Sequence, residues 1–185
     1  MQTTPLPPLA DIPSLETDRL LLRGHCLEDF PQSAAMWADP NVTRHILERP
    51  LTEEEAWSRL LRYVGHWAIV GFGYWVIIEK HTGGFAGEAG FAELKRDIQP
   101  CFKRVPEIGW VLASRFHGKG FATEAVRAIT AWGDAHFKTP TRCIISPDNI
   151  ASFRVAEKCG YREIHRTTYH GRPTVILERK LEPTK

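Results

Sequence analysis

The 185-residue sequence lacks the signals of several large protein classes. No apolar run approaches the length of a membrane span, and no basic N-terminal region precedes an apolar core, so neither a membrane helix nor a secretory signal is expected. The formal net charge of +2 is too small to make nucleic acid an expected partner. There are no internal repeats and no low-complexity tracts. This length is most simply one domain with a sizeable core.

Cysteine and histidine are present, but without the spacing of metal or redox sites. The four cysteines form no C-x-x-C pair and the eight histidines no H-E-x-x-H pattern, so no metal site is expected. Widely spaced cysteines of this kind are typical of reduced thiols in a cytoplasmic protein. Cys143 and Cys159 are expected to be buried packing residues, and Cys101 to be the only exposed thiol.

The pattern of apolar residues predicts one mixed α/β domain behind a short tail. Four prolines within residues 1–14 predict an extended tail, and residues 15–182 are expected to form the domain. The element order β-α-α-β-β-β-α-β-α-β-β predicts a mixed sheet flanked by helices. The predicted strands are residues 19–23, 74–79, 85–94, 106–112, 142–146, 161–169 and 174–179. Three of the predicted helices are residues 28–38, 119–137 and 150–159. A further helix is predicted from the capping box at Thr52 and Glu55 to the break at Gly71.

The segment from Arg115 to Ala122 is the most informative part of the chain. It joins a predicted strand to a predicted helix, and Gly118 and Gly120 allow the backbone to approach an anion closely. Backbone N–H groups in such a turn, together with the partial positive charge of a helix N-terminus, form a phosphate cradle. A nucleotide is a weaker interpretation, because Phe121 follows Gly120 where the Walker pattern needs lysine, and the three-glycine dinucleotide fingerprint is absent.

Four blocks of the sequence, in order, resemble the GNAT superfamily of acyl-CoA-dependent N-acetyltransferases. Residues 16–23 (ETDRLLLR) resemble the opening strand of the branch that contains the ribosomal-protein-alanine N-acetyltransferases, and residues 106–112 (PEIGWVL) resemble its fourth strand. Residues 115–125 are similar to the acetyl-CoA loop R/Q-x-x-G-x-G/A, and residues 149–161 to the N-x-x-S…G-F/Y block. The resemblance implies a single GNAT-like α/β domain with a mostly antiparallel sheet of about seven strands, splayed fourth and fifth strands and about four flanking helices.

The resemblance also implies acetyl-CoA as the acetyl donor, with no metal. The N–H groups from His117 to Ala122 would face the diphosphate, and the pantetheine arm would pair with the edge of the fourth strand at Val111 and Ala113. Asn149 would bond the same arm. Arg115 would shape the loop, and Lys158 would lie near the phosphates. The implied cofactor-binding residues are Val111, Leu112, Ala113, Arg115, His117, Gly118, Lys119, Gly120, Phe121, Ala122, Asn149 and Lys158.

Acetyl transfer to an amine needs a base for the ammonium proton and a donor for the departing thiolate. Glu107 matches a family glutamate that is often given the role of base; its structural alternatives are a solvent-facing glutamate or a partner for Arg142. Glu88 is the alternative carboxylate, with a structural or substrate-orienting role as the favoured interpretation. Glu124, in the first turn of a helix, is interpreted as structural.

The family's usual acid is a tyrosine four residues before the final glycine of the last block, and this chain has Ala156 there. Ser152 is the candidate substitute, although a hydroxyl at a helix start also bonds local backbone. Tyr161 and Tyr169 are further candidates. Direct transfer is predicted, and an acyl-cysteine intermediate is the competing mechanism. A non-catalytic acyl-CoA-binding module is the competing function, and Ala156 is the feature in its favour.

The predicted acceptor is a primary amine, either a protein N-terminus or a small molecule. The resemblance implies that it lies between the first two helices and the C-terminal hairpin of the sheet. The basic loop at residues 95–105 is predicted at its entrance. A cytoplasmic monomer or homodimer is expected, with neither nucleic acid nor a membrane as a partner.

Overall fold

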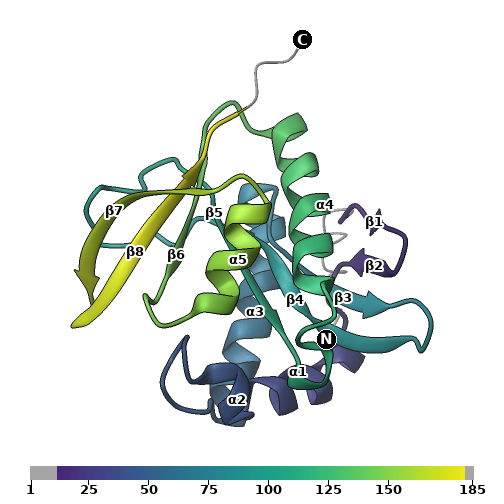
Figure 1. The fold of residues 1–185 in the computed structure, drawn as a ribbon. Helices are drawn as coiled ribbons and strands as arrows, with labels where there is room; N and C mark the ends of the chain where they lie inside the picture. Colours follow the sequence, from purple (N-terminus) through teal and green to yellow (C-terminus); the bar gives the residue numbers. More distant parts are fainter. Residues whose placement is uncertain (1–11, 182–185) are drawn as a thin grey trace, which may run out of the picture.

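The computed structural model describes residues 12–181, which form a sheet of eight strands with helices on both faces (Figure 1). The strand order is β1-β2-β3-β4-β5-β6-β8-β7, and every neighbouring pair is antiparallel except β5 and β6. The strands are β1 (Leu15–Glu16), β2 (Leu20–Arg23), β3 (Tyr74–Glu79), β4 (Gly84–Ala92), β5 (Glu107–Leu112), β6 (Thr141–Ile145), β7 (Arg162–Tyr169) and β8 (Arg172–Arg179). The predicted mixed, mostly antiparallel α/β fold is confirmed.

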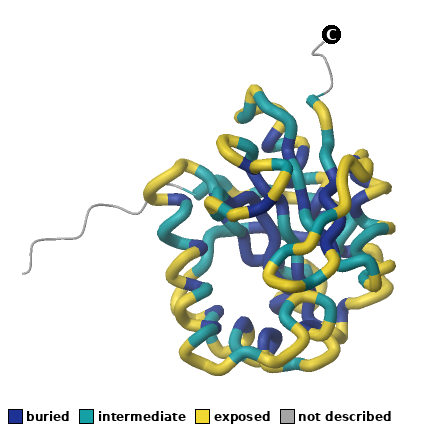
Figure 2. Tube along the Cα trace, turned by 90° about the vertical axis from the view of Figure 1, so that its left-hand side faces the viewer, coloured by how far each residue is buried: buried dark blue, intermediate teal, exposed yellow. Residues whose placement is uncertain are grey.

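Helices α4 and α5 lie in front of the sheet in Figure 1, and α3 lies behind it. The tube in Figure 2 shows buried residues along the central strands, of which β4 is the most completely buried. The helices are α1 (Phe30–Trp37), α2 (Pro40–Thr43), α3 (Glu53–Val70), α4 (Phe121–His136) and α5 (Ile150–Lys158), with the short 3-10 segments η1 (Leu27–Asp29) and η2 (Ser114–Phe116). Among these residues, no helix is both long and apolar enough to cross a bilayer.

Two short elements, β1 and α2, were not expected from the sequence. A strand of two residues and a helix of four are too short to show a period. Helix α1 ends before Pro40, in agreement with the predicted end at residue 38, and Pro40 also opens α2, because proline is well tolerated at the first helical position. Asp39 caps this turn by accepting from the Asn41 N–H at 2.8 Å.

Helix α3 forms as its local sequence predicts. The Thr52 hydroxyl accepts from the Glu55 N–H at 3.2 Å, and the Glu55 carboxylate accepts from the Thr52 N–H at 2.9 Å, so the capping box is complete. The helix ends at Gly71, whose φ of +78° gives the left-handed cap that glycine adopts without strain.

The parallel strands β5 and β6 separate soon after they meet. Their register consists of the single pair Glu107 and Arg142, and the Arg142 N–H donates to the Pro106 carbonyl at 3.0 Å. Because β1 adds one strand to the count, these are the predicted fourth and fifth strands. The predicted splay is therefore present, and it leaves most of one edge of β5 without a strand partner.

The predicted boundary between tail and domain, after residue 14, differs from the structure at residues 12–14. Residues 1–11 lie outside the described residues, but Ile12 packs against the core and the Trp75 indole donates to the Pro13 carbonyl at 2.7 Å. Assigning residues 12–14 to the tail was therefore wrong. Proline predicts an extended backbone, and an extended backbone also packs along a domain surface.

Candidate active site

The loop between β5 and α4 keeps a row of backbone N–H groups free. From Gly118 to Thr123, no N–H donates to an acceptor in the described part of the chain. Gly118 and Gly120 have φ of +76° and +81°, a region that glycine adopts readily. The 16-residue helix α4 begins at Phe121 and adds the positive end of its dipole. These groups together form a seat for an anion.

The His117 N–H is not part of this row. It donates to the Ser114 carbonyl at 3.0 Å, so its assignment to the diphosphate is wrong. The His117 ring instead secures the loop, because its Nε2 lies 2.8 Å from the Leu112 carbonyl. A carbonyl only accepts, so this nitrogen carries the proton.

Two arginines also hold the loop in place. The Arg115 guanidinium donates to the Phe85 carbonyl on β4 at 3.0 Å, which agrees with a loop-shaping role. Arg19 donates to the Lys119 carbonyl at 3.0 Å and forms an ion pair with Glu124 at 2.6 Å. Glu124 also accepts from the Thr17 hydroxyl at 2.6 Å, which makes it a structural link, as interpreted from the sequence. The position of the loop is thus held by side chains of the protein itself.

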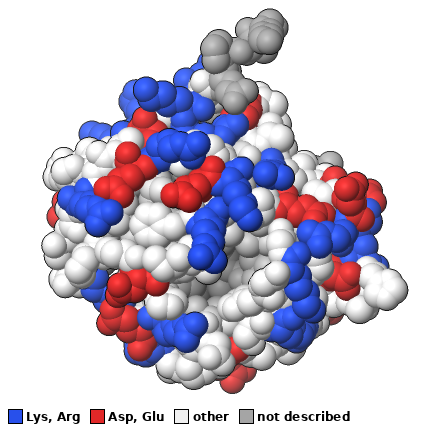
Figure 3. Space-filling model, viewed as in Figure 1, with Lys and Arg blue, Asp and Glu red and all other residues white. Residues whose placement is uncertain are grey.

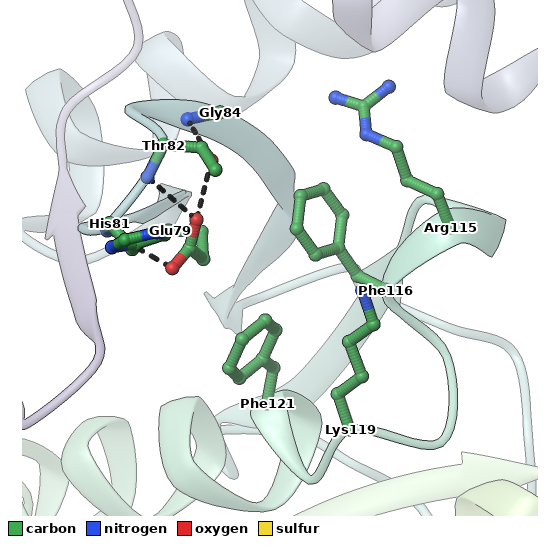
Figure 4. Close-up of a pocket in the computed structure, with 8 residues that line it drawn as sticks. All are labelled: Glu79, His81, Thr82, Gly84, Arg115, Phe116, Lys119 and Phe121. Atoms are coloured by element: carbon green, nitrogen blue, oxygen red, sulfur yellow. Dashed lines mark hydrogen bonds between the residues drawn. The ribbon is translucent and has the colours of Figure 1, made fainter.

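Two hollows flank the loop. One, of about 520 Å³, lies between the loop and the β3–β4 turn (Figure 4), and it is lined by Glu79, His81, Thr82, Gly84, Arg115, Phe116, Lys119 and Phe121. The Arg115 guanidinium carbon lies 5.0 Å from the centroid of the Phe116 ring, and Figure 4 shows both side chains together with Phe121. The other, of about 760 Å³, is lined by Thr17, Asp18, Arg19, Gly120, Thr123, Glu124, Arg127, Ala128 and Lys158. Figure 3 shows Lys and Arg side chains on both sides of a hollow on the α4 and α5 face.

The backbone groups of β5 that face the gap to β6 are one residue away from the predicted ones. The Ala113 N–H donates to the Ala86 carbonyl on β4 at 2.9 Å, so it cannot serve the gap between β5 and β6. Backbone groups alternate in direction along a strand, so Val111, paired with Glu88, also faces β4. The Val111 and Ala113 assignments are therefore wrong. The groups that face the gap are those of Ile108, Trp110 and Leu112.

Glu107 is held by an arginine that the sequence did not identify. Its two carboxylate oxygens accept from Arg96 Nε and Nη2 at 2.6 and 2.7 Å. Arg142 pairs with Glu178 at 2.9 Å, so the proposed alternative of an Arg142 partner is wrong. Burial lowers the pKa of Arg96, but the hydrogen bonds and charge of Glu107 outweigh it and raise that pKa. Each Glu107 oxygen keeps a second lone pair for a proton or a water.

Glu88 is sealed inside the fold. Its side chain has no exposed surface, and it accepts from the Ser33 hydroxyl at 2.6 Å and the Trp37 indole at 2.9 Å. His25 Nε2 lies 3.5 Å from the same carboxylate. Burial acts to raise the pKa of Glu88, but the contacts with His25, Ser33 and Trp37 outweigh it and lower that pKa. This burial agrees with a structural role and leaves Glu107 as the carboxylate near the edge of β5.

The candidate acids differ in how free their hydroxyls are. The Tyr161 hydroxyl is fully buried and shares a hydrogen bond of 2.7 Å with Thr141, which removes Tyr161 as a candidate. The Tyr169 hydroxyl accepts from Arg96 at 3.2 Å. The Ser152 hydroxyl has no hydrogen-bond partner among residues 12–181, so the local backbone bond considered for it is absent. Ala156 is fully buried.

Asn149 has one role in the structure and room for another. Its side-chain oxygen accepts from the Ser152 N–H at 3.1 Å and so caps α5. The side-chain NH₂ group keeps two donors for a ligand. Lys158 is exposed on the last turn of α5 and lines the larger hollow beside Gly120.

Two of the four cysteines, Cys143 and Cys159, are poorly placed for an acyl-enzyme. Cys143 and Cys159 are buried as predicted, and burial raises the pKa of Cys143 well above its ordinary value and that of Cys159 to about 11. Cys101 is exposed as predicted, but Cys26 is exposed too, so the expectation of a single exposed thiol is wrong. Within the described chain, no cluster of three or more His, Cys, Asp or Glu side chains is arranged to hold a metal ion.

Sequence reasoning did not identify Tyr74, which reaches the candidate site from β3. A Cβ at Gly109 on β5 would lie 2.0 Å from the Tyr74 hydroxyl, so the phenol occupies the space of a missing side chain. Glycine inside a strand often marks such a close approach. Gly109 was therefore a usable signal, but it does not say which residue approaches.

The comparisons with known proteins agree with this geometry. Residues 19–162 match the model of the acetyltransferase (GNAT) domain. The uncharacterized protein YkkB of Bacillus subtilis (strain 168) is 32% identical over 175 residues, covering 90% of this chain and 95% of that protein.

Solved structures also share the fold. A GnaT-family acetyltransferase from Bordetella pertussis is 33% identical, with a TM-score of 0.80 over 90% of this chain and 99% of its own. The structure of RimL, a ribosomal L7/L12 alpha-N-protein acetyltransferase in complex with coenzyme A, is 17% identical, with a TM-score of 0.73 over 91% of this chain and 98% of its own. The family expected from the four sequence blocks is confirmed: this chain belongs to the GNAT acetyltransferases.

Proposed function

We propose that this protein is an acetyl-CoA-dependent N-acetyltransferase that transfers an acetyl group directly to a primary amine, either a protein N-terminus or a small molecule. The observation that carries the proposal is the row of free N–H groups from Gly118 to Thr123, which follows β5, the strand whose edge is left open by its separation from β6. An anion seat beside an open strand edge suits a ligand with a diphosphate at one end and amides along its arm. The coenzyme A in the RimL structure supports the same donor.

The donor would lie along three groups of contacts. Its diphosphate would accept from the N–H groups at residues 118–123, with Lys158 nearby in the larger hollow. Its pantetheine amides would pair with the free edge of β5, at Ile108 and Trp110. The Leu112 carbonyl already accepts from the His117 ring. The Asn149 NH₂ group would donate to the same arm.

The chemistry would use two side chains and the backbone. Glu107 would accept the ammonium proton, directly or through a water, because its carboxylate lies on the strand beside which the thioester is placed. N–H groups on the free edge of β5 would donate to the thioester oxygen as it gains charge. The Ser152 hydroxyl, free of other partners, would donate to the departing thiolate. The buried thiols support direct transfer over an acyl-cysteine intermediate.

The amine would enter on the face of the sheet that carries α1 and α3. The loop at residues 95–105 borders this entrance, since Arg96 spans from Glu107 to the Tyr169 hydroxyl at the end of β7. The four free cysteines support an enzyme that works in the cytoplasm. A monomer or a homodimer is proposed.

The test is release of free thiol from acetyl-CoA in the presence of a panel of amines and N-terminal peptides. The proposal expects thiol release that depends on acceptor, and mass spectrometry should find the acetyl group on the amine. Tight binding of acetyl-CoA, with no release for any acceptor, would favour the non-catalytic binding module instead.

A further inference from the structure

Two arginines lie beside Tyr63, whose ring stacks on that of Tyr74, and a third pairs with Glu107. Arg59 and Arg62 come from α3, and Arg96 comes from the loop at residues 95–105. We call these three side chains the arginine cluster. The charges of all three, and that of Glu107, act on the Tyr74 hydroxyl. This hydroxyl lies against Gly109 on β5, next to the strand edge assigned above to the acetyl donor.

Aromatic rings fix the geometry of the cluster. Tyr63 and Tyr74 stack with ring centroids 4.4 Å apart and an interplanar angle of 5°. The Arg59 guanidinium lies 4.0 Å from the centroid of the Trp37 ring, and the Arg62 guanidinium lies 6.0 Å from that of Tyr63. Arg59 Nη1 also donates to the Tyr63 hydroxyl at 3.4 Å, so aromatic side chains help to position the guanidinium groups.

Two of the three cations have no anion. Arg59 and Arg62 form no ion pair with any carboxylate in residues 12–181, and Arg59 Nε is buried without a hydrogen-bond partner. Only Arg96 has a carboxylate partner, which is Glu107. Glu88 is near Tyr63, but Ser33, Trp37 and His25 already surround its carboxylate.

This surplus of positive charge is costly without a ligand. Arg62 as a whole residue is exposed, but its guanidinium is partly buried. That partial burial, and then the positive charge of Arg59, lower the pKa of Arg62. A buried N–H group with no acceptor also destabilises the fold. Burial and then the charge of Glu107 raise the pKa of Tyr74, so its phenol stays neutral and keeps an O–H group that can donate to a ligand. Unsatisfied groups of this kind cluster at ligand sites.

Given the acetyltransferase function proposed above, we propose that the acceptor is a primary amine that also carries a carboxylate, which Arg59, Arg62 and the Tyr74 hydroxyl bind. A guanidinium presents paired N–H donors that match a carboxylate. Bound there, the carboxylate would hold its amine beside Glu107 and the edge of β5. Polycationic amines, such as polyamines and aminoglycosides, would meet like charge and bind poorly.

The first experiment compares acceptors that differ only in charge. Peptides with glutamate, glutamine or lysine as the second residue, and free amino acids beside their amides, are assayed for thiol release from acetyl-CoA. The carboxylate form should have a kcat/KM about 10 to 100 times that of its amide, since one charge-assisted hydrogen bond contributes about 1.5–3 kcal/mol. The peptide and amino-acid arms show which source the site accepts. Equal or better use of the amide or lysine forms would overturn the proposal.

The second experiment changes the protein. The Arg62→Gln variant should lose about tenfold of the carboxylate preference, through KM rather than kcat, and its exposed position favours normal folding. Lys138→Gln, an equal loss of charge at an exposed site just after α4, should keep the preference. An unchanged preference in Arg62→Gln would contradict the assignment.

A binding measurement separates this proposal from the proposed activity. The protein saturated with coenzyme A is titrated calorimetrically with the amino carboxylates and their amides. Selective binding that Arg62→Gln weakens, without thiol release for any acceptor, would refute the acetyltransferase activity and keep the carboxylate site. Thiol release without selective binding would do the reverse.

Discussion

Replacing Glu107 with glutamine tests the chemical step most sharply. Glutamine keeps the size of the side chain and one acceptor for Arg96, but it cannot take a proton from an ammonium at neutral pH. General base catalysis contributes about 10²- to 10⁴-fold, or about 2.7–5.5 kcal/mol. We therefore expect kcat to fall at least about 100-fold in Glu107→Gln, with little change in the dissociation constant of acetyl-CoA.

The same substitution should also weaken the fold. The side chains of Arg96 and Glu107 are 21% and 9% exposed, so the pair is largely buried. Removing one charge of a buried pair costs about 3–5 kcal/mol, and the remaining Tyr169 contact of Arg96 favours the lower value, about 3 kcal/mol. For a domain of this size, that corresponds to a fall in Tm of about 6–12 °C.

Arg96→Gln is the matched control, because it breaks the same pair from the other side and keeps the carboxylate. Its Tm should fall by a similar amount, while kcat at saturating acceptor should fall less than about tenfold if Glu107 is the base. Stopped-flow or steady-state thiol release gives kcat, and calorimetric melting gives Tm. Equal kcat values for the two variants would refute the role of Glu107 as base and leave it as an anchor for the loop at residues 95–105.

Three further predictions follow from particular residues. Gly118→Ala has open space for its methyl group but a φ of +76°, so it should lower stability by about 1–2 kcal/mol and weaken acetyl-CoA binding about tenfold in calorimetry. Gly171→Ala, at φ +75° and equally open in the β7–β8 turn, should leave binding unchanged. Equal binding by both variants would argue against the anion seat. Thr52→Ala removes the cap of α3 and should lower stability by about 1 kcal/mol and Tm by about 2–4 °C. Ser58→Ala, on the exposed face of α3, should leave Tm unchanged, and equal melting curves for the two variants would contradict the capping role. The folded-state pKa of Glu88 lies below the ordinary value of 4.5, so the contribution of its carboxylate to stability is fully present above about pH 4.5 and is lost as the pH falls through the folded-state pKa. Glu88→Gln should therefore show a smaller fall in Tm between pH 6 and pH 3 than the wild type. Parallel curves of Tm against pH would refute this linkage.

The parts of the fold that follow from local sequence were predictable. The capping box at Thr52 and Glu55 and the left-handed cap at Gly71 depend on residues within a few positions of each other, and both form. Strand β3 has the predicted bounds because Gly73 precedes its apolar run and the polar turn at residues 80–83 follows it. The motif at residues 115–122 predicted a tight turn before a helix, and Gly118 and Gly120 adopt the positive φ that such a turn uses. The anion that the turn would bind stays a prediction.

The parts that depend on distant partners were not predictable. The free edge of β5 was displaced by one residue because the Ala86 carbonyl on β4 sets the phase of the alternation, and the period of two does not reveal it. Glu124 has its partners on Thr17 and Arg19, more than 100 residues away in sequence. Tyr74 meets Gly109 only because β3, β4 and β5 lie side by side.

Calorimetric titration of the folded protein with coenzyme A and acetyl-CoA is the most direct test of the central claim, that the free N–H groups at residues 118–123 seat the diphosphate of the acetyl donor. The claim predicts saturable binding of one ligand per chain, with a dissociation constant between about 1 μM and 1 mM. No detectable heat for either ligand at millimolar concentration, from protein that melts cooperatively, would contradict it.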